Sequence, residues 1–191
     1  MSPNQVSLIS AAFTAVGIML ISILPPSWLS GLVITLFLVV GFMLDAADGQ
    51  LARLRGTTSL AGEWLDHFLD ALKMVAIHSA VFICWYRFMD IPSVLLLIPL
   101  AFQLAAVGIF AGGTLAALLR RLKPEKPEST AKPSNVRAFL LLPVDYGVFC
   151  VSFLLFGAPT IFNVTYVVLA AVHWVFLLFF IVKWFKELGS K

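Results

Sequence analysis

The sequence predicts an all-α integral membrane protein with six transmembrane helices and both termini in the cytoplasm. Apolar residues make up 61% of the 191 residues and charged residues only 12%, about half the charged share of an average soluble domain. The apolar runs are continuous and about twenty residues long, which is the length of a membrane-spanning helix rather than of a barrel strand. The basic residues also gather on one side of the predicted helices.

Proline, glycine and polar residues divide the chain into apolar segments. The first segment stops at Pro25 and Pro26, and the second continues past Leu44 as a polar stretch. The expected helices cover about residues 5–24, 28–55, 61–88, 92–122, 136–156 and 159–188, and residues 123–135 form a polar loop. A length of 191 residues indicates one domain over residues 1–191.

The distribution of lysine and arginine sets the expected orientation, because cytoplasmic loops are rich in these residues. Arg87 alone lies at the opposite ends of the helices, and Lys73 lies within a helix. All other basic residues fall on one side: Arg53, Arg55, Arg120, Arg121, Lys123, Lys126, Lys132, Arg137, Lys183, Lys186 and Lys191. This side is expected to be cytoplasmic, in a bacterial plasma membrane. Nothing in the pattern indicates a nucleic-acid surface.

Several further residues within the apolar runs are interpreted as packing residues without a chemical role. Cys84 and Cys150 lack metal-ligand spacing and are expected to be buried thiols. His78 and His173 are expected to be hydrogen-bonded packing residues. The spacing of Gly108 and Gly112 suits close helix contact, either within the subunit or between two subunits of a homodimer.

Four aspartates lie where acids are costly. Asp45 and Asp48 fall on the second expected helix, and Asp66 and Asp70 on the third. One charge at mid-bilayer costs about 2.5 to 3.5 kcal/mol on the mildest scale. At 1.5 Å per residue, each pair lies about 26 to 32 Å from the outer end of its helix. All four aspartates therefore reach the cytoplasmic edge of the membrane, between helices two and three.

The spacing of these acids also gives them a common face. Asp45 and Asp48 are three residues apart, while Asp66 and Asp70 are four apart. Carboxylates that converge in a partly dry pocket either take up protons or bind cations, and hard divalent ions take oxygen ligands. The alternatives are ion pairs or solvated helix ends. Gly49, Ala52 and Gly62 lie near the same stripes and leave room for a ligand.

In order, these residues read Asp45-x2-Asp48-Gly49-x2-Ala52-Arg53-x8-Gly62-x3-Asp66-x3-Asp70. The pattern resembles the signature of the CDP-alcohol phosphotransferase (CDP-alcohol phosphatidyltransferase) family at every fixed position. The segment Ser2-Pro3-Asn4-Gln5-Val6 resembles the Pro-Asn segment that the family carries before its first helix. The resemblance implies transfer of a substituted phosphate from a CDP-linked donor to an acceptor hydroxyl, with release of CMP.

The resemblance also implies roles for individual residues. Two divalent cations, Mg²⁺ or Mn²⁺, would bind at Asp45, Asp48, Asp66 and Asp70. Asp70 would also be the general base that takes the acceptor's proton. The nucleotide and diphosphate subsite would be lined by Gly49, Ala52, Arg53, Gly62 and Asn4.

The acceptor side has weaker signals. Lys73 extends the stripe of Asp66 and Asp70 by one turn, and its alternative role is a salt bridge to Asp70 or Asp145. Asp145, expected within the fifth helix, is either a structural partner or a wall of the acceptor pocket. His67 is either a packing residue or an accessory base. The remaining acceptor candidates, whose alternative is topological anchoring, are Arg120, Arg121 and Arg137.

CDP-diacylglycerol with glycerol phosphate or inositol phosphate is the leading substrate pair for this resemblance. The runner-up is a soluble CDP-alcohol transferred to a lipid hydroxyl, because Asp66-His67 resembles the choline and ethanolamine phosphotransferase branch. An aromatic prenyltransferase is disfavoured because Asp48 and Asp66 are close in sequence. An ion-coupled transporter is disfavoured because the acids lie near the membrane edge and no inverted repeat is visible.

Overall fold

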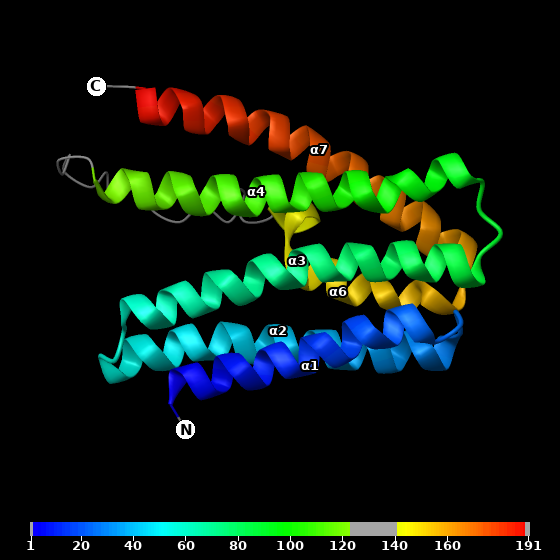
Figure 1. The fold of residues 1–191 in the computed structure, drawn as a ribbon, viewed down its shortest axis with the longest axis horizontal. Coiled ribbons are helices and arrows are strands. Elements are labelled where there is room, and N and C mark those ends of the chain that lie inside the picture. Colours follow the sequence, from blue (N-terminus) through cyan, green and yellow to red (C-terminus); the bar gives the residue numbers. More distant parts are fainter. Residues whose placement is uncertain (1, 123–140, 190–191) are drawn as a thin grey trace.

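The computed structural model describes residues 2–122 and 141–189, which form a bundle of long helices (Figure 1). The long helices are α1 (Pro3–Ile23), α2 (Trp28–Arg55), α3 (Leu60–Phe88), α4 (Leu97–Arg121) and α7 (Pro159–Gly189). A 3₁₀ turn, η1 (Ser93–Leu96), leads into α4. With η1 counted as part of α4, all five are long and apolar enough to cross a membrane. They confirm the predicted membrane helices apart from the fifth.

The fifth predicted helix differs from the prediction. Its first residues, 136–140, and the predicted loop at 123–135 lie outside the described residues. The rest consists of η2 (Leu142–Val144), α6 (Tyr146–Ser152) and η3 (Phe153–Gly157), so a continuous helix over this part is wrong. Pro143 has no amide hydrogen to continue a helix. Asp145 begins a new one by accepting hydrogen bonds from the amides of Gly147 at 2.8 Å and Val148 at 3.2 Å.

The helices pack as two groups. In one group α1 lies against both α2 and α3, and in the other α4 lies against α7. The pair α3 and α4 joins the groups, and η3 packs against both α2 and α7. The close backbone contacts around the aspartates are those of α1 with α2 and α3, rather than of α2 with α3. Space for side chains therefore remains between the two acid-bearing helices.

The packing of α1 on α2 depends on small residues. The Ser10 hydroxyl donates a hydrogen bond to the Gly41 carbonyl at 2.8 Å. A methyl group at Gly41 would overlap Thr14 Oγ1. The glycine lets the two backbones approach closely, which fixes the level of Asp45 and Asp48 relative to α1.

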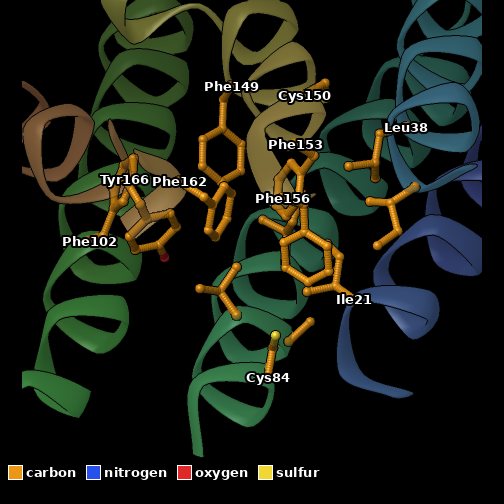
Figure 2. Packing of buried hydrophobic residues seen from close by; sticks show 14 of the residues in the cluster. Ile21, Leu38, Cys84, Phe102, Phe149, Cys150, Phe153, Phe156, Phe162 and Tyr166 are labelled. Atoms are coloured by element: carbon orange, nitrogen blue, oxygen red, sulfur yellow. The ribbon is translucent and has the colours of Figure 1, made fainter. Parts of the chain in front are cut away.

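An aromatic core holds the two groups together away from the aspartates (Figure 2). Phe102, Phe149, Phe153, Phe162 and Tyr166 are 4% exposed or less. The rings of Phe102 and Tyr166 have centroids 5.0 Å apart, and those of Phe153 and Phe162 5.3 Å apart. These rings come from α4, α6, η3 and α7, and the same core includes Ile21 of α1, Leu38 of α2 and Cys84 of α3, so it joins the two groups.

The smaller predictions about buried residues are confirmed. Cys84 and Cys150 are free and buried. His78 Nδ1 hydrogen-bonds the Tyr166 hydroxyl at 2.7 Å, and His173 Nδ1 hydrogen-bonds the Leu169 carbonyl at 2.8 Å. On the outside, by contrast, large apolar side chains such as Leu29 and Phe185 are exposed at 72% and 81%. Such a surface suits lipid as the surrounding solvent.

The glycine pair of α4 makes its contact within the chain. A methyl group at Gly108 would lie 3.1 Å from Leu177, and one at Gly112 would lie 2.5 Å from Trp184, both on α7. The spacing is therefore explained by packing of α4 on α7. It leaves the predicted homodimer without support from these two residues.

Candidate metal and nucleotide site

One end of the bundle carries the α2–α3 turn, and we call it the site end. The start of α1, the end of α4 and the end of α7 lie at this same end (Figure 1). The placement of both termini on one side of a membrane stays a prediction. The cytoplasmic identity of that side stays a prediction.

Caps fix the turn between α2 and α3. Gly56 ends α2 with a φ of 62°, a left-handed conformation that glycine adopts without strain. Ser59 begins α3 by accepting a hydrogen bond from the Gly62 amide at 3.0 Å. The two helices thus reverse direction over a few residues, which brings the acids of α2 and α3 to one level.

The structure brings the four predicted aspartates together. One oxygen each from Asp45, Asp48 and Asp66 lies within 4.8 Å of the others. Asp66 and Asp70, with His67, form a second group of the same closeness. Helical spacings of three and four place each pair on one face, and the space between α2 and α3 lets the two pairs meet.

Asp48 is the most enclosed of the four. Asp48 is only 5% exposed. Its Oδ2 atom has no hydrogen-bond partner within the described part of the chain. The Ser7 hydroxyl of α1 lines the same cavity and donates to the Pro3 carbonyl at 3.2 Å. A buried carboxylate oxygen without a partner is costly. A hard divalent cation such as Mg²⁺ or Mn²⁺ fits this set of carboxylate oxygens and would satisfy the unpaired atom.

Lys73 supplies positive charge on the deeper side of the aspartates. Its Nζ atom lies 2.6 Å from Asp70 Oδ1 and 3.1 Å from Asp45 Oδ1, and its side chain is 7% exposed. It also lies 5.6 Å from the centre of the Tyr146 ring. The predicted ion pair with Asp70 is present, but the second partner is Asp45 rather than Asp145. Asp145 is engaged with the α6 backbone instead.

A cavity of about 780 Å³ opens beside the aspartates at the site end. Its walls include Asp48 and Asp66 together with all five residues predicted for the nucleotide subsite, namely Asn4, Gly49, Ala52, Arg53 and Gly62. A methyl group at Gly62 would lie 3.2 Å from both Asn4 Oδ1 and Ser59 Oγ. The glycine therefore leaves room for these two polar side chains at the cavity wall.

The whole-chain comparison with known families agrees with this geometry. The model of the family described as CDP-alcohol phosphatidyltransferase matches residues 1–182. The chain belongs to this family. No curated protein matches the chain. Members of the CDP-alcohol phosphatidyltransferase family are transferases of phosphate-containing groups, so the chain is an enzyme of this class.

Several residues that line the cavity of this CDP-alcohol phosphatidyltransferase were not predicted from the sequence. Ser7 comes from α1, and Thr57, Thr58 and Ser59 from the α2–α3 turn. The polar composition of that turn was a usable signal. Helix α4 also lines the cavity, but only because of its tertiary packing, so no local sequence pattern could predict its residues. They are Gly113, Thr114, Ala117 and Leu118.

The predicted acceptor residues of this CDP-alcohol phosphatidyltransferase separate into two sets. His67 and Arg121 line the cavity. Arg121 Nη1 lies 2.8 Å from Glu63 Oε1, and His67 Nε2 lies 3.9 Å from the same atom. These contacts form a charged rim between α3 and α4.

The remaining acceptor candidates lie elsewhere. Arg120 donates to Glu187 on α7 at 3.2 Å and to the Ala116 carbonyl at 3.1 Å. Asp145 caps α6 and does not line the cavity, so its predicted place inside a helix is wrong. Arg137 lies outside the described residues.

Proposed function

We propose that the chain transfers a substituted phosphate from a CDP-linked donor to the hydroxyl of an acceptor alcohol, with release of CMP. The leading donor is CDP-diacylglycerol, and the leading acceptors are glycerol phosphate and inositol phosphate, which makes this a step of phospholipid biosynthesis. The observation that carries the proposal is the position of the unpaired Asp48 oxygen. It lies with Asp66 at the wall of a cavity that also contains Arg53, and an oxygen of Asp45 lies within 4.8 Å of both carboxylates.

Two divalent cations, Mg²⁺ or Mn²⁺, would be held by Asp45, Asp48, Asp66 and Asp70. When bound, they would neutralise charge on the diphosphate and on the CMP leaving group. Arg53 on the cavity wall supports the same diphosphate through charge-assisted hydrogen bonds. Gly49 and Gly62 carry no side chain on the cavity wall, which lets the nucleotide approach the helix backbones.

Asp70 takes the acceptor's proton in this proposal. The acceptor oxygen forms a bond to the donor's distal phosphorus as the bond from that phosphorus to the CMP oxygen breaks, and the hydroxyl proton passes to Asp70. Lys73 holds Asp70 at 2.6 Å, which orients the carboxylate. His67 and Arg121 at the rim are the best-placed acceptor contacts, because both line the cavity.

The test begins with purified protein in detergent, CDP, and a titration of Mg²⁺ or Mn²⁺. CDP binding is expected to need the metal and to be lost in Asp45→Asn and Asp66→Asn. The matched control is Asp90→Asn, which removes an exposed carboxylate from the far end of α3. Metal-independent binding, or unchanged binding in both site variants, contradicts the two-metal proposal.

A second assay identifies the substrates. Membranes that contain the protein are incubated with each CDP donor and a panel of acceptors, and the product lipid is identified by mass. A product from CDP-diacylglycerol and a polyol phosphate supports the leading pair. A product from a soluble CDP-alcohol and a lipid alcohol replaces it with the runner-up. Cation uptake into vesicles without any transfer product points to a transporter.

A further inference from the structure

Three of the four aspartates line two cavities beside α1 and α3: Asp48 and Asp66 line the large one, and Asp45 lines a smaller one. The large cavity takes Pro3, Asn4 and Ser7 from α1. A second cavity of about 240 Å³ lies deeper along the same helices. Its walls are Ala11, Thr14, Ala15 and Ile18 of α1, Leu69, Leu72, Lys73 and Ala76 of α3, and Asp45 of α2.

The two cavities follow one another along the same two helices, and we call them together the furrow. On α1 the lining positions follow one another at steps of three and four, from Ser7 through Ala11 to Ala15, and on α3 they run from Asp66 through Leu69 to Lys73 and Ala76. Such steps keep residues on one helix face. Asp45, which lines the deeper part, groups with Asp48 and Asp66 of the outer part.

The chemistry of the furrow changes at the aspartates. The outer part contains Asn4, Arg53 and several hydroxyl side chains. The deeper part is mostly alanine, leucine and isoleucine. Lys73 is the one cation among the residues of the deeper wall, and it is already paired with two carboxylates. The deeper part thus suits a hydrocarbon better than a second phosphate group.

We propose that the deeper cavity, between α1 and α3, holds a hydrocarbon chain of a lipid-linked CDP donor. The proposal rests on the function proposed above. A donor with its nucleotide in the large cavity and its diphosphate at the aspartates has its remaining part beyond them, inside the membrane-spanning part of α1 and α3. A soluble CDP-alcohol has nothing to place there.

The size of the cavity limits what enters. About 240 Å³ is less than the roughly 300 to 1,000 Å³ of pockets that enclose a whole small ligand. It therefore holds a segment of one chain, while the second chain stays in the bilayer. Leu72 lines the cavity and is 51% exposed, so a chain enters sideways from the lipid. Lipid is as apolar as leucine, so contact with this cavity adds little affinity of its own. A side chain that blocks the cavity would instead clash with the chain attached to the bound diphosphate, and so weaken binding of the lipid-linked donor.

The first test fills the deeper cavity with larger side chains. Ala76→Leu and Ala11→Leu place larger side chains on its two walls. Ala12→Leu is the matched control, because Ala12 is exposed on α1 and lines neither cavity. Both cavity variants are expected to bind CDP-diacylglycerol about tenfold more weakly, with CDP itself bound within twofold of wild type. Ala12→Leu is expected to change neither. Equal weakening of CDP and CDP-diacylglycerol overturns the proposal.

The second test uses the unchanged chain, so it stands even if a cavity variant fails to fold. CDP-diacylglycerol with a photoreactive diazirine in one acyl chain is bound in the presence of Mg²⁺ and irradiated. Labels are expected on residues 11–18 and 69–76, and excess CDP is expected to prevent them. Labels mainly on other helices overturn the proposal.

Two further outcomes separate this proposal from the proposed function. If the wild type shows no metal-dependent CDP binding, the proposed function fails and this inference fails with it. If CDP binding is intact but Ala76→Leu raises the KM only for a lipid acceptor, the furrow holds the acceptor. The donor assignment is then wrong, while the proposed reaction survives.

Discussion

Lys73 of α3 lies 3.1 Å from Asp45 of α2 and so joins the two helices across the space between their acids. The same ammonium group lies 2.6 Å from Asp70, one turn earlier on α3. Lys73 is 7% exposed, and the two carboxylates 23% and 22%. In the absence of metal, this lysine is the cation that offsets the deeper two aspartates.

Replacement of Lys73 by methionine is expected to destabilise the metal-free protein. The change leaves two largely enclosed carboxylates without their counter-charge, and breaking a buried ion pair costs up to about 3 to 5 kcal/mol. We expect a lower melting temperature in EDTA and a clearly smaller difference in saturating Mg²⁺, since the metal supplies the missing charge. Thermal unfolding with and without Mg²⁺ measures this.

Lys183→Met is the control for that experiment. Lys183 forms a more exposed ion pair with Glu187 at 3.7 Å, a kind worth little. Its melting temperature is expected to stay near that of wild type in both conditions. An equal loss of stability in Lys73→Met with and without Mg²⁺ would show that the lysine and the metal do not share the same carboxylates.

Asp70→Asn is expected to lower turnover much more than donor affinity. A general base contributes about 10²- to 10⁴-fold to rate, whereas Asp48 and Asp66, the two aspartates that line the large cavity, stay in place in this variant. We expect kcat to fall at least a hundredfold and the dissociation constant for CDP to change less than threefold. Single-turnover kinetics and equilibrium binding separate the two quantities. Loss of CDP binding as large as in Asp45→Asn would reassign Asp70 as mainly a metal ligand.

Gly62→Ala is expected to separate binding from stability. Alanine within a helix is about 0.5 to 1 kcal/mol more stable than glycine. The added methyl group, however, would lie 3.2 Å from Asn4 and Ser59 and displace both from the cavity wall. Displacement of Ser59 also weakens the cap of α3 and offsets the gain from alanine, so we expect weaker CDP binding with a melting temperature near that of wild type. Gly189→Ala, where nothing lies within 4 Å, is the control, and equal CDP affinity in the two variants would contradict the assigned role.

Most of the fold and the aspartate cluster followed from the sequence because both depend on local periodicity. The length of the apolar runs predicted five of the helices. The spacing of Asp45 and Asp48, and of Asp66 and Asp70, predicted that the two members of each pair share one helix face. The break at Asp145 was missed because apolar residues on both sides masked the effects of Pro143 and of the cap. The Lys73–Asp45 pair was missed because it crosses between helices, and its geometry depends on how α1 spaces α2 and α3.

The acceptor candidates were the hardest part to predict. Arg120 and Arg121 are adjacent in sequence, and no local pattern distinguishes them. Only the packing of α4 between α3 and α7 shows that one faces the cavity and the other faces α7. Helical neighbours point about 100° apart, so a choice between them requires the tertiary structure.

That difference gives the last prediction, which compares Arg121→Met with Arg120→Met. Arg121 lines the cavity and pairs with Glu63 at its rim, so it is available to an anionic substrate once one enters. A hydrogen bond to a charged group is worth about 1.5 to 3 kcal/mol, and we expect Arg121→Met to weaken substrate binding about tenfold, with a smaller difference at high salt. Arg120 pairs with Glu187 instead, so Arg120→Met is expected to leave the KM for both substrates unchanged. A matched series of KM measurements with donor and acceptor at two salt concentrations also shows which substrate Arg121 contacts. Equal effects of the two substitutions would mean that the arginines act only through the net charge of the site end, as a topological anchor does.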